Sequence, residues 1–322
     1  FKLTYGLRLD GLFFDNSDLM TNNKILAIDY IGKDGKVRNI DTGKWPSANI
    51  TVSPRVGFNW DLTEDKSLTL RGGTGFFSGR LPLVFFTNMP TNSGMVQYQA
   101  KLNGHGKNGG VKTDMSQFAG GILKREELLK KLISMGYPNS ISPKDGTVPA
   151  EISAVDPKFK MPQVWKTSIA VDYNFPTSFP FSISAEGIFN KTINGVIIRD
   201  WSVNPVHGFA RFNGVDNRPI FQNYKQTYES NGKTVNLPNA YVLENTNKGY
   251  GYSGTFTVNM RPIEGLSLMA AYTHTVNKEL TGMPGSNASS VLNYMGTIYG
   301  PNDPGLHNSQ YVTPDRFVAS LT

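Results

Sequence analysis

The chain has 322 residues and no cysteine, so a disulfide framework, a cysteine-ligated metal and a thiol nucleophile are all excluded. Hydrophobic residues make up 39% and charged residues 18%, and with 33 glycines, 19 prolines and 11% aromatic residues this composition favours a β-rich protein with long loops over a helical or disordered one. The net charge of +7 is spread along the chain, and its one basic cluster, at 124–131, is interleaved with Glu126 and Glu127, so we expect a solvated surface and no nucleic-acid partner.

Alternation of apolar and polar residues predicts eight strands along the chain. In the first, Phe1, Leu3 and Tyr5 share one face while Lys2 and Thr4 share the other. The eight alternating segments are 1–10, 55–62, 68–71, 165–175, 181–190, 250–260, 266–272 and 317–321. The sequence has no run of 18 apolar residues that would suggest a transmembrane helix. Alternating transmembrane strands do not raise the average hydropathy of a window, however, so a β-barrel membrane protein remains possible.

Short and long connections alternate between these strands. Three are short, near 63–67, 176–180 and 261–265. Five-residue turns there would place apolar residues opposite each other, as a one-sided sheet requires. The pairs so predicted are Leu62 with Leu68, Phe175 with Phe181, and Met260 with Leu266. The long connections are 14–52, 79–162, 201–242 and 279–312.

This plan predicts an all-β fold, a transmembrane antiparallel β-barrel segment with long extracellular loops. Compact soluble domains rarely hold several structureless loops beyond about 12–15 residues, whereas outer-membrane barrels have short periplasmic turns and long outer loops. Strands of about 9–11 residues also match a tilted crossing of the hydrocarbon layer. Aromatic residues at strand ends fit interfacial girdles, although a soluble sandwich would show them too; they include Trp60, Trp165, Tyr173, Phe175 and Phe181. The expected location is the bacterial outer membrane.

The long loops contain two predicted local elements. Leucine and isoleucine spacing between 123 and 133 predicts a short amphipathic helix that ends at Gly136 and packs on neighbouring loops. Loose alternation over 25–39 around Asp34 and Gly35 predicts a hairpin above the sheet. The chain starts and stops within strand patterns, so we expect it to be a piece of something larger.

No group of residues points to catalysis, and we expect no enzyme activity, cofactor or metal. The four histidines lack ligand spacing, and the glycine-rich segment at 71–75 has no Lys-Ser/Thr and opens no helix. Asp172 and Glu186 are predicted on the inner face of adjacent strands and could form a carboxylate pair. With Arg71 and Lys166 on the same face, a hydrogen-bonded lumen wall is the favoured interpretation.

Several segments of the chain resemble segments of Oar-like TonB-dependent receptors, and they occur in the same order. Residues 70–82 (LRGGTGFFSGRLP), running on to Asn88 and 91–94, resemble a signature stretch of that family, and residues 53–58 (SPRVGF) are similar to a strand opening common in TonB-dependent barrels. Three further stretches match: 156–165 (DPKFKMPQVW), 271–275 (AYTHT) and 314–317 (PDRF). Together these matches span most of the chain.

The resemblance implies a Bacteroidota-type outer-membrane active transporter. Such proteins have a 22-stranded barrel, an N-terminal plug and energy supplied through TonB. Residues 1–322 would then be a partial barrel of about eight strands, without the plug, the remaining strands or the region that contacts TonB. An eight-stranded barrel standing alone would leave a lumen only wide enough for side chains, which fits poorly with such large loops.

Three functions remain open at this stage. The first is active transport, in which the barrel lines the uptake route and the loops capture a ligand: a siderophore, glycan, peptide or protein. The second is surface adhesion or assembly, in which the barrel anchors the loops to a surface or periplasmic protein partner, and the third is a passive porin. All require outer-membrane lipid, and the first requires TonB. The aromatic or basic loop residues considered for ligand binding, each of which could equally serve loop packing, are Arg80, Phe85, Phe86, Tyr98, Trp201, Phe209, Arg211, Phe212 and Tyr299.

Overall fold

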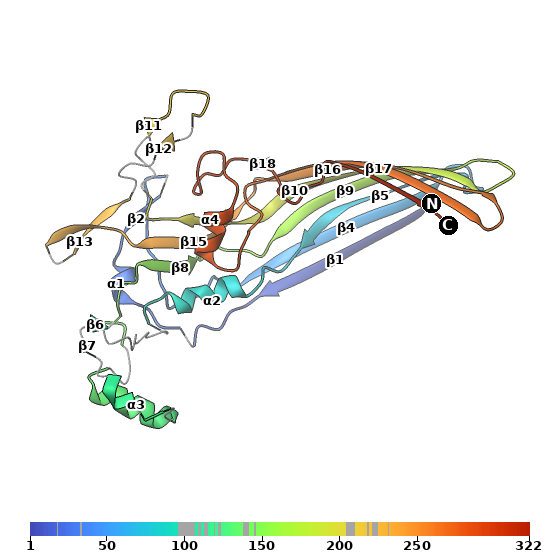
Figure 1. Ribbon diagram of the computed structural model, residues 1–322. Coiled ribbons are helices and arrows are strands. Elements are labelled where there is room, and N and C mark those ends of the chain that lie inside the picture. Colours follow the sequence, from blue (N-terminus) through green and yellow to red (C-terminus); the bar gives the residue numbers. More distant parts are fainter. Residues whose placement is uncertain are drawn as a thin grey trace.

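The computed structural model consists of a curved sheet with a folded lobe at one end (Figure 1). Both termini lie at the opposite end of the sheet. The residues that it does not describe are 18, 33, 96–106, 109–110, 113–114, 119, 122–123, 138–141, 145, 204–209, 218, 221–224 and 231.

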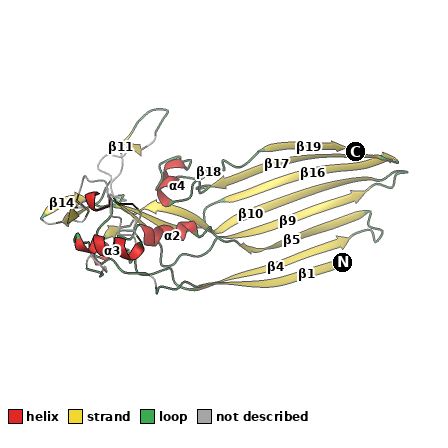
Figure 2. Ribbon diagram, turned by 60° about the horizontal axis from the view of Figure 1, so that its bottom comes forward, coloured by secondary structure: helices red, strands yellow, loops and turns green. Residues whose placement is uncertain are grey.

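Eight long strands form the sheet, as the alternation predicted. They are β1 (Lys2–Leu12), β4 (Asn49–Asp61), β5 (Leu68–Ser78), β9 (Gln163–Asn174), β10 (Phe181–Asp200), β16 (Tyr250–Ile263), β17 (Leu266–Glu279) and β19 (Asp315–Leu321). Each is antiparallel to its neighbour, and they lie side by side in chain order (Figure 2). Among the described residues, β1 pairs only with β4, and β19 only with β17, so this segment of barrel is open along both edges.

Two of the three predicted turn registers are confirmed. The Leu62 N–H donates to the Leu68 carbonyl, and the Phe175 N–H to the Phe181 carbonyl, each at 2.9 Å.

The third predicted register is wrong. Met260 is opposite Leu268 rather than Leu266, and Ile263 takes the place opposite Leu266. The turn has two residues instead of five because Gly265 adopts a φ of +79°, which a tight hairpin turn needs. The register shift between Met260 and Ile263 spans Pro262, which has no N–H to donate to the ladder.

The two faces of the sheet differ in polarity. One register row crosses seven strands with apolar side chains on the outer face: Trp60, Leu70, Val171, Ala185, Phe256, Tyr272 and Phe317. Several of these stay exposed, including Phe256 at 47% and Phe317 at 70%. The opposite face carries Arg71, Asp172 and Glu186. An exposed apolar outer face and a polar inner face fit a membrane barrel and exclude a sandwich, whose apolar face would be buried.

The folded lobe is organised on an extension of β10. Phe181 to Lys191 pair with β16 in the sheet, and beyond a bulge at 192–194 the strand pairs with β15 (Asn239–Thr246). β8 (Glu151–Val155) adds to β15 in parallel. Most residues of these two strands lie in segments that were predicted to be loops. The alternation pattern did not reveal them, because their pairing joins residues far apart in the chain.

Two apolar cores cover opposite faces of this three-stranded unit, since alternate residues of β15 enter each. On one face, Val155, Ile198 and Leu243 pack with α2 (Val84–Thr91) and α4 (Ala288–Tyr294). On the other, Ile152, Ala240 and Val242 pack with residues of α1 (Asn23–Leu26) and of β2 (Tyr30–Ile31). The long loops therefore form a packed body.

Small elements complete the lobe. The predicted hairpin at 25–39 is confirmed as β2 paired with β3 (Val37–Arg38), although α1 occupies its start. The predicted helix is α3 (Arg125–Ser134), followed by Gly136 at φ +99°. None of its described residues is buried, but Lys131 contacts a neighbouring segment, where its ammonium group lies 5.8 Å from the centroid of the Phe118 ring. The rest are β6 (Lys107–Asn108), β7 (Val111–Lys112), η1 (Met115–Phe118), β11 (Ala210–Arg211), β12 (Pro219–Ile220), β13 (Thr227–Ser230), β14 (Lys233–Asn236) and β18 (His307–Asn308).

Candidate functional site: the inner wall and the extracellular lobe

The inner wall of the sheet is held by charged side chains from three adjacent strands. Arg71 of β5 donates to Asp172 of β9 at 2.7 Å and approaches Glu186 of β10 at 3.4 Å. The Ser184 hydroxyl donates to the second oxygen of Asp172 at 2.6 Å. The two carboxylates predicted on this face are thus bridged by an arginine, which makes a hydrogen-bonded wall rather than an acid–base pair.

A hollow of about 690 Å³ lies towards the extracellular end of the sheet, beneath residues 309–313. Lys166 and Arg316 supply its positive charge, while Asn190 and Asn277 supply amide groups, and several serine and threonine hydroxyls complete the lining. The Ser309 N–H donates to the Asn277 carbonyl at 2.9 Å, which fastens the covering segment to β17. Donors and positive charge in one hollow suit an anionic or hydroxyl-rich solute.

The lobe places two predicted ligand residues inside its apolar core. Phe86 on α2 is 3% exposed, and its ring centroid lies 5.2 Å from that of Phe14, 5.7 Å from that of Phe159 and 6.3 Å from that of Trp45. Phe85 is buried in the same core. Four chain segments meet in this aromatic group, so both phenylalanines stabilise the lobe.

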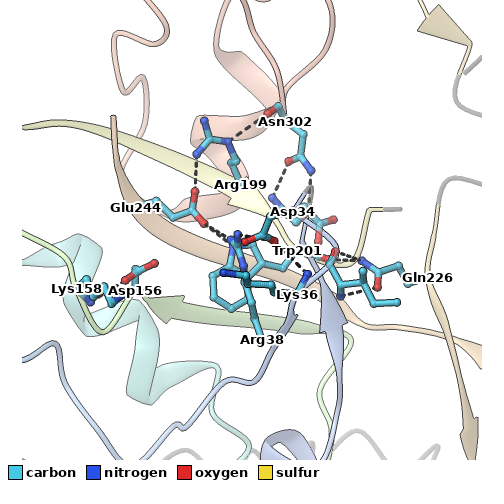
Figure 3. Close-up of polar contacts among 12 residues, drawn as sticks. Asp34, Lys36, Arg38, Asp156, Lys158, Arg199, Trp201, Gln226, Glu244 and Asn302 are labelled. Carbon is cyan, nitrogen blue, oxygen red and sulfur yellow. Dashed lines mark hydrogen bonds and ion pairs between the residues drawn. The ribbon is translucent and has the colours of Figure 1, made fainter. Parts of the chain in front are cut away.

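Trp201, a third predicted residue, belongs to a polar cluster around Glu244 (Figure 3). The Glu244 carboxylate is largely buried, accepts from the Trp201 indole N–H at 2.7 Å and pairs with Arg199 at 2.5 Å. Arg38 approaches it at 3.7 Å and lies over the Trp201 ring, 5.4 Å from the centroid. This Glu244 cluster joins the β2–β3 hairpin to β10 and β15. Sequence reasoning missed its charged members, because Arg199 and Glu244 are brought together by the register of β10 with β15, and Arg38 by the placement of the β2–β3 hairpin.

A second set of polar contacts extends this cluster to the last long loop. Asn302 exchanges two hydrogen bonds with the backbone of Asp200, each at 2.7 Å, as a neighbouring strand would. Its own carbonyl accepts from Arg199 at 3.3 Å. The Asp200 carboxylate pairs with Lys225 at 3.0 Å. Segments around 38, 200, 225, 244 and 302 are therefore cross-linked on one side of the lobe.

Two titratable groups of the lobe have shifted pKa values. Burial raises the pKa of the Tyr30 phenol, and the Asp200 charge raises it further. The Tyr30 hydroxyl has no hydrogen-bond partner among the residues that the structure describes, although its side chain is 1% exposed. Burial also raises the pKa of Glu151, with repulsion by Asp200 in the same direction and a hydrogen bond from Ser289 opposing it.

The other predicted ligand residues are scattered. Arg80, Arg211, Phe212 and Tyr299 are exposed on the lobe, and Arg211 donates to the Asn217 carbonyl at 2.9 Å. Tyr98 and Phe209 lie outside the described residues. The structure does not gather the described candidates into one pocket.

Within the described part of the chain, no three His, Asp or Glu side chains converge as metal ligands. In the same residues, no helix is long and apolar enough to cross a membrane. Of the described histidines, His274 contacts Asp315 at 2.8 Å and His307 contacts the Gly305 carbonyl at 3.1 Å.

An open antiparallel sheet with an exposed apolar outer face, a charged inner face, short turns at one end and a folded lobe at the other defines a transmembrane β-barrel segment. The chain belongs to the family of outer membrane β-barrel domains, which matches residues 2–322. Its location is the bacterial outer membrane.

Comparison with individual proteins adds little detail. Among solved structures, the chain is similar to one described as "Copper transporter OprC", with 13% identity and a TM-score of 0.36, over 89% of this chain and 27% of that chain. It therefore spans about a quarter of that protein's length. No curated protein sequence matches the chain.

Proposed function

We propose that the chain forms part of the wall of an outer-membrane active transporter, of the Oar-like TonB-dependent type that its motifs resemble. In this proposal the lobe captures a ligand outside the cell, and the inner wall lines the uptake route. The observation that carries it is the inner face itself, where Arg71, Asp172 and Glu186 form a charged wall below a basic hollow. A barrel that served only as an anchor would need no such hollow.

The open edges of the sheet support a larger barrel. The edge of β1 exposes backbone groups along 11 residues, and unpaired N–H and C=O groups within hydrocarbon each cost several kcal/mol. In this proposal, further strands pair with β1 and β19 in the membrane. A barrel of the expected 22 strands would have room for a plug, through which TonB would act.

The proposal assigns transport and no catalysis to the chain. The two inner-face carboxylates are paired with Arg71, so neither is free to serve as a general acid or base. The hollow lined by Lys166 and Arg316 favours an anionic or hydroxyl-rich ligand over an apolar one.

Single cysteines can test this proposal because the chain contains none. Ser253→Cys places a thiol of nearly the same size in the hollow, and the adjacent Gly254→Cys places one on the outer face, where an added Cβ meets no atom within 4 Å. Cells that make the native protein with either change are treated with a sulfonated, membrane-impermeant maleimide. Labelling rates are measured with and without a protonophore.

Active transport predicts that Ser253→Cys is labelled, and that the protonophore slows its labelling because plug movement needs energy. Equal rates with and without the protonophore would identify a passive pore instead. Absence of labelling would favour a closed anchor for adhesive loops. Labelling of Gly254→Cys as fast as Ser253→Cys would overturn the assignment of inner and outer faces.

A further inference from the structure

A row of aromatic and basic side chains crosses the outer face of the sheet at its extracellular end. Trp165 of β9 is opposite Lys191 of β10. Lys191 is in turn opposite Tyr250 of β16, and Tyr250 is opposite Lys278 of β17. Phe76 of β5 is opposite Trp165. One register row, named here the Lys–Tyr–Lys row after Lys191, Tyr250 and Lys278, therefore continues an aromatic girdle with two positive charges.

Alternation places both lysines on the lipid-facing side. Lys191 is six residues from Ala185, and Lys278 is six from Tyr272, both of which belong to the apolar outer row. The preceding residues, Asn190 and Asn277, line the hollow on the inner face. At the height of the Lys–Tyr–Lys row, the two asparagine amides face the lumen and the two lysine ammonium groups face the membrane. Hydrocarbon around the row would disfavour this arrangement, because it would surround the charged groups.

The height of the row explains how charge is tolerated there. The periplasmic end of the apolar face is at Phe181, where the ring stacks on Phe175, and Lys191 follows ten residues later on the same strand. At about 3.3 Å per residue and a tilt of about 40°, ten residues span about 25 Å of membrane, the height of the apolar band of such barrels. The Lys–Tyr–Lys row thus lies at the boundary between hydrocarbon and the headgroups of the outer leaflet.

Within the described part of the chain, neither lysine has an anionic partner. Among the described residues, no ion pair or side-chain hydrogen bond involves Lys191 or Lys278. Asp315, an acidic residue on the outer face lower on the sheet, accepts from Tyr272 at 2.6 Å and pairs with His274 at 2.8 Å. An ammonium group beside hydrocarbon is stabilised by an anion at the same depth, and the charged lipid headgroups of the outer leaflet lie at that depth.

We propose that the Lys–Tyr–Lys row binds the phosphate groups of a phosphorylated glycolipid in the outer leaflet. Two interstrand spacings, about 10 Å, separate the lysine Cα atoms, and their four-carbon side chains can reach one headgroup from both sides. The Tyr250 ring lies between them at headgroup level, where aromatic residues of membrane proteins gather. This site is independent of the transport proposal, because an adhesive anchor would bind the same lipid.

The test compares lipid retention by the native protein and a double variant, Lys191→Gln/Lys278→Gln. A matched control, Lys124→Gln/Lys130→Gln, removes the same charge from exposed positions on or beside α3, away from the membrane. Each protein is placed in nanodiscs that contain phospholipid and purified outer-membrane glycolipid, either intact or dephosphorylated. Bound glycolipid is titrated by native mass spectrometry, and gel mobility before and after heating verifies the folded barrel.

Each lysine near an anionic surface contributes about fivefold to affinity, so the double variant should bind intact glycolipid about 30-fold more weakly. The α3 control should bind like the native protein, and dephosphorylated glycolipid should be retained no better than phospholipid. Equal retention by the double variant, or equal retention of the dephosphorylated lipid, would overturn the proposal. Full displacement by millimolar inorganic phosphate would also overturn it, by revealing a general anion site.

Discussion

Replacement of Glu244 by alanine should open the lobe locally. The change removes the carboxylate that accepts from the Trp201 indole N–H and that pairs with the guanidinium groups of Arg199 and Arg38. Removing one partner of a buried ion pair costs about 3–5 kcal/mol. Arg199 and Arg38 retain 31% and 37% side-chain exposure, so water can solvate them in part, and we expect a smaller loss of about 2 kcal/mol in the free energy of local opening.

Hydrogen–deuterium exchange of the native protein in lipid nanodiscs measures this opening. The amides of β15 are protected by their pairing with β10 and β8. Since 1.4 kcal/mol is a factor of ten, a loss of about 2 kcal/mol should speed exchange in residues 239–246 about 30-fold. Glu244→Gln keeps an acceptor for the Trp201 N–H but loses the charge, and should fall between native protein and Glu244→Ala.

The matched control is Glu127→Ala, which removes an exposed carboxylate on α3. Its exchange in β15 should equal that of the native protein. The reasoning would be refuted if Glu244→Ala left exchange in residues 239–246 within threefold of native, because the cluster would then contribute nothing to the docking of β15 and the hairpin. An equal acceleration throughout the eight-stranded sheet would also refute it, because the effect would then be global.

Two further predictions concern the periplasmic turns. Gly265→Val should lower the stability of the β16–β17 hairpin by roughly 1–2 kcal/mol, because valine disfavours the positive φ of this turn. The folded fraction after refolding in detergent, measured by gel mobility, should therefore fall. The control Gly254→Ala has open space at its added Cβ and should refold like the native protein. Hydrogen bonds from the side chain and N–H of Ser67 lower the pKa of Asp65 from 3.8 to about 2. Its carboxylate therefore stabilises the folded state above about pH 4, and this contribution is lost as the pH falls through about 2. The difference in urea midpoint between native protein and Asp65→Ala should shrink between pH 5 and pH 2, and a constant difference would contradict the assigned bonds.

The membrane-spanning part of the fold could be predicted from the sequence because it is locally encoded. Each strand alternates by itself, and the turn after Leu62 needs only residues within a few positions to set its register. The turn before Leu266 was predicted with the wrong length, because the bulge at Pro262 and the conformation of Gly265 are not visible in alternation. Arg71 was predicted to share a hydrogen-bonded wall with Asp172 and Glu186, but its bridging of the two carboxylates was not predicted, since these partners are about 100 residues away.

The lobe could not be derived in the same way. The arrangement of the lobe depends on the parallel pairing of β8 with β15. Paired residues, such as Glu151 and Asn239, are 88 positions apart in the chain, and no local sequence pattern specifies such a contact. One signal was present: Glu244 follows the apolar residues Val242 and Leu243, a position where an acidic side chain must be either exposed or paired. Its partner Arg38 could only be found once the hairpin was placed in space.

The length of β10 has a mechanical consequence. One continuous strand of 20 residues belongs first to the membrane wall and then to the sheet inside the lobe, and it changes partners at the bulge between Thr192 and Asn194. A load applied to the lobe from outside the cell would pass along a covalent backbone straight into the wall, with that bulge as the place where the strand can bend. At Gly195 an added Cβ would lie 2.7 Å from the Thr192 methyl group, so this bending point is also tightly packed. The same strand therefore carries force in the membrane wall and in the lobe.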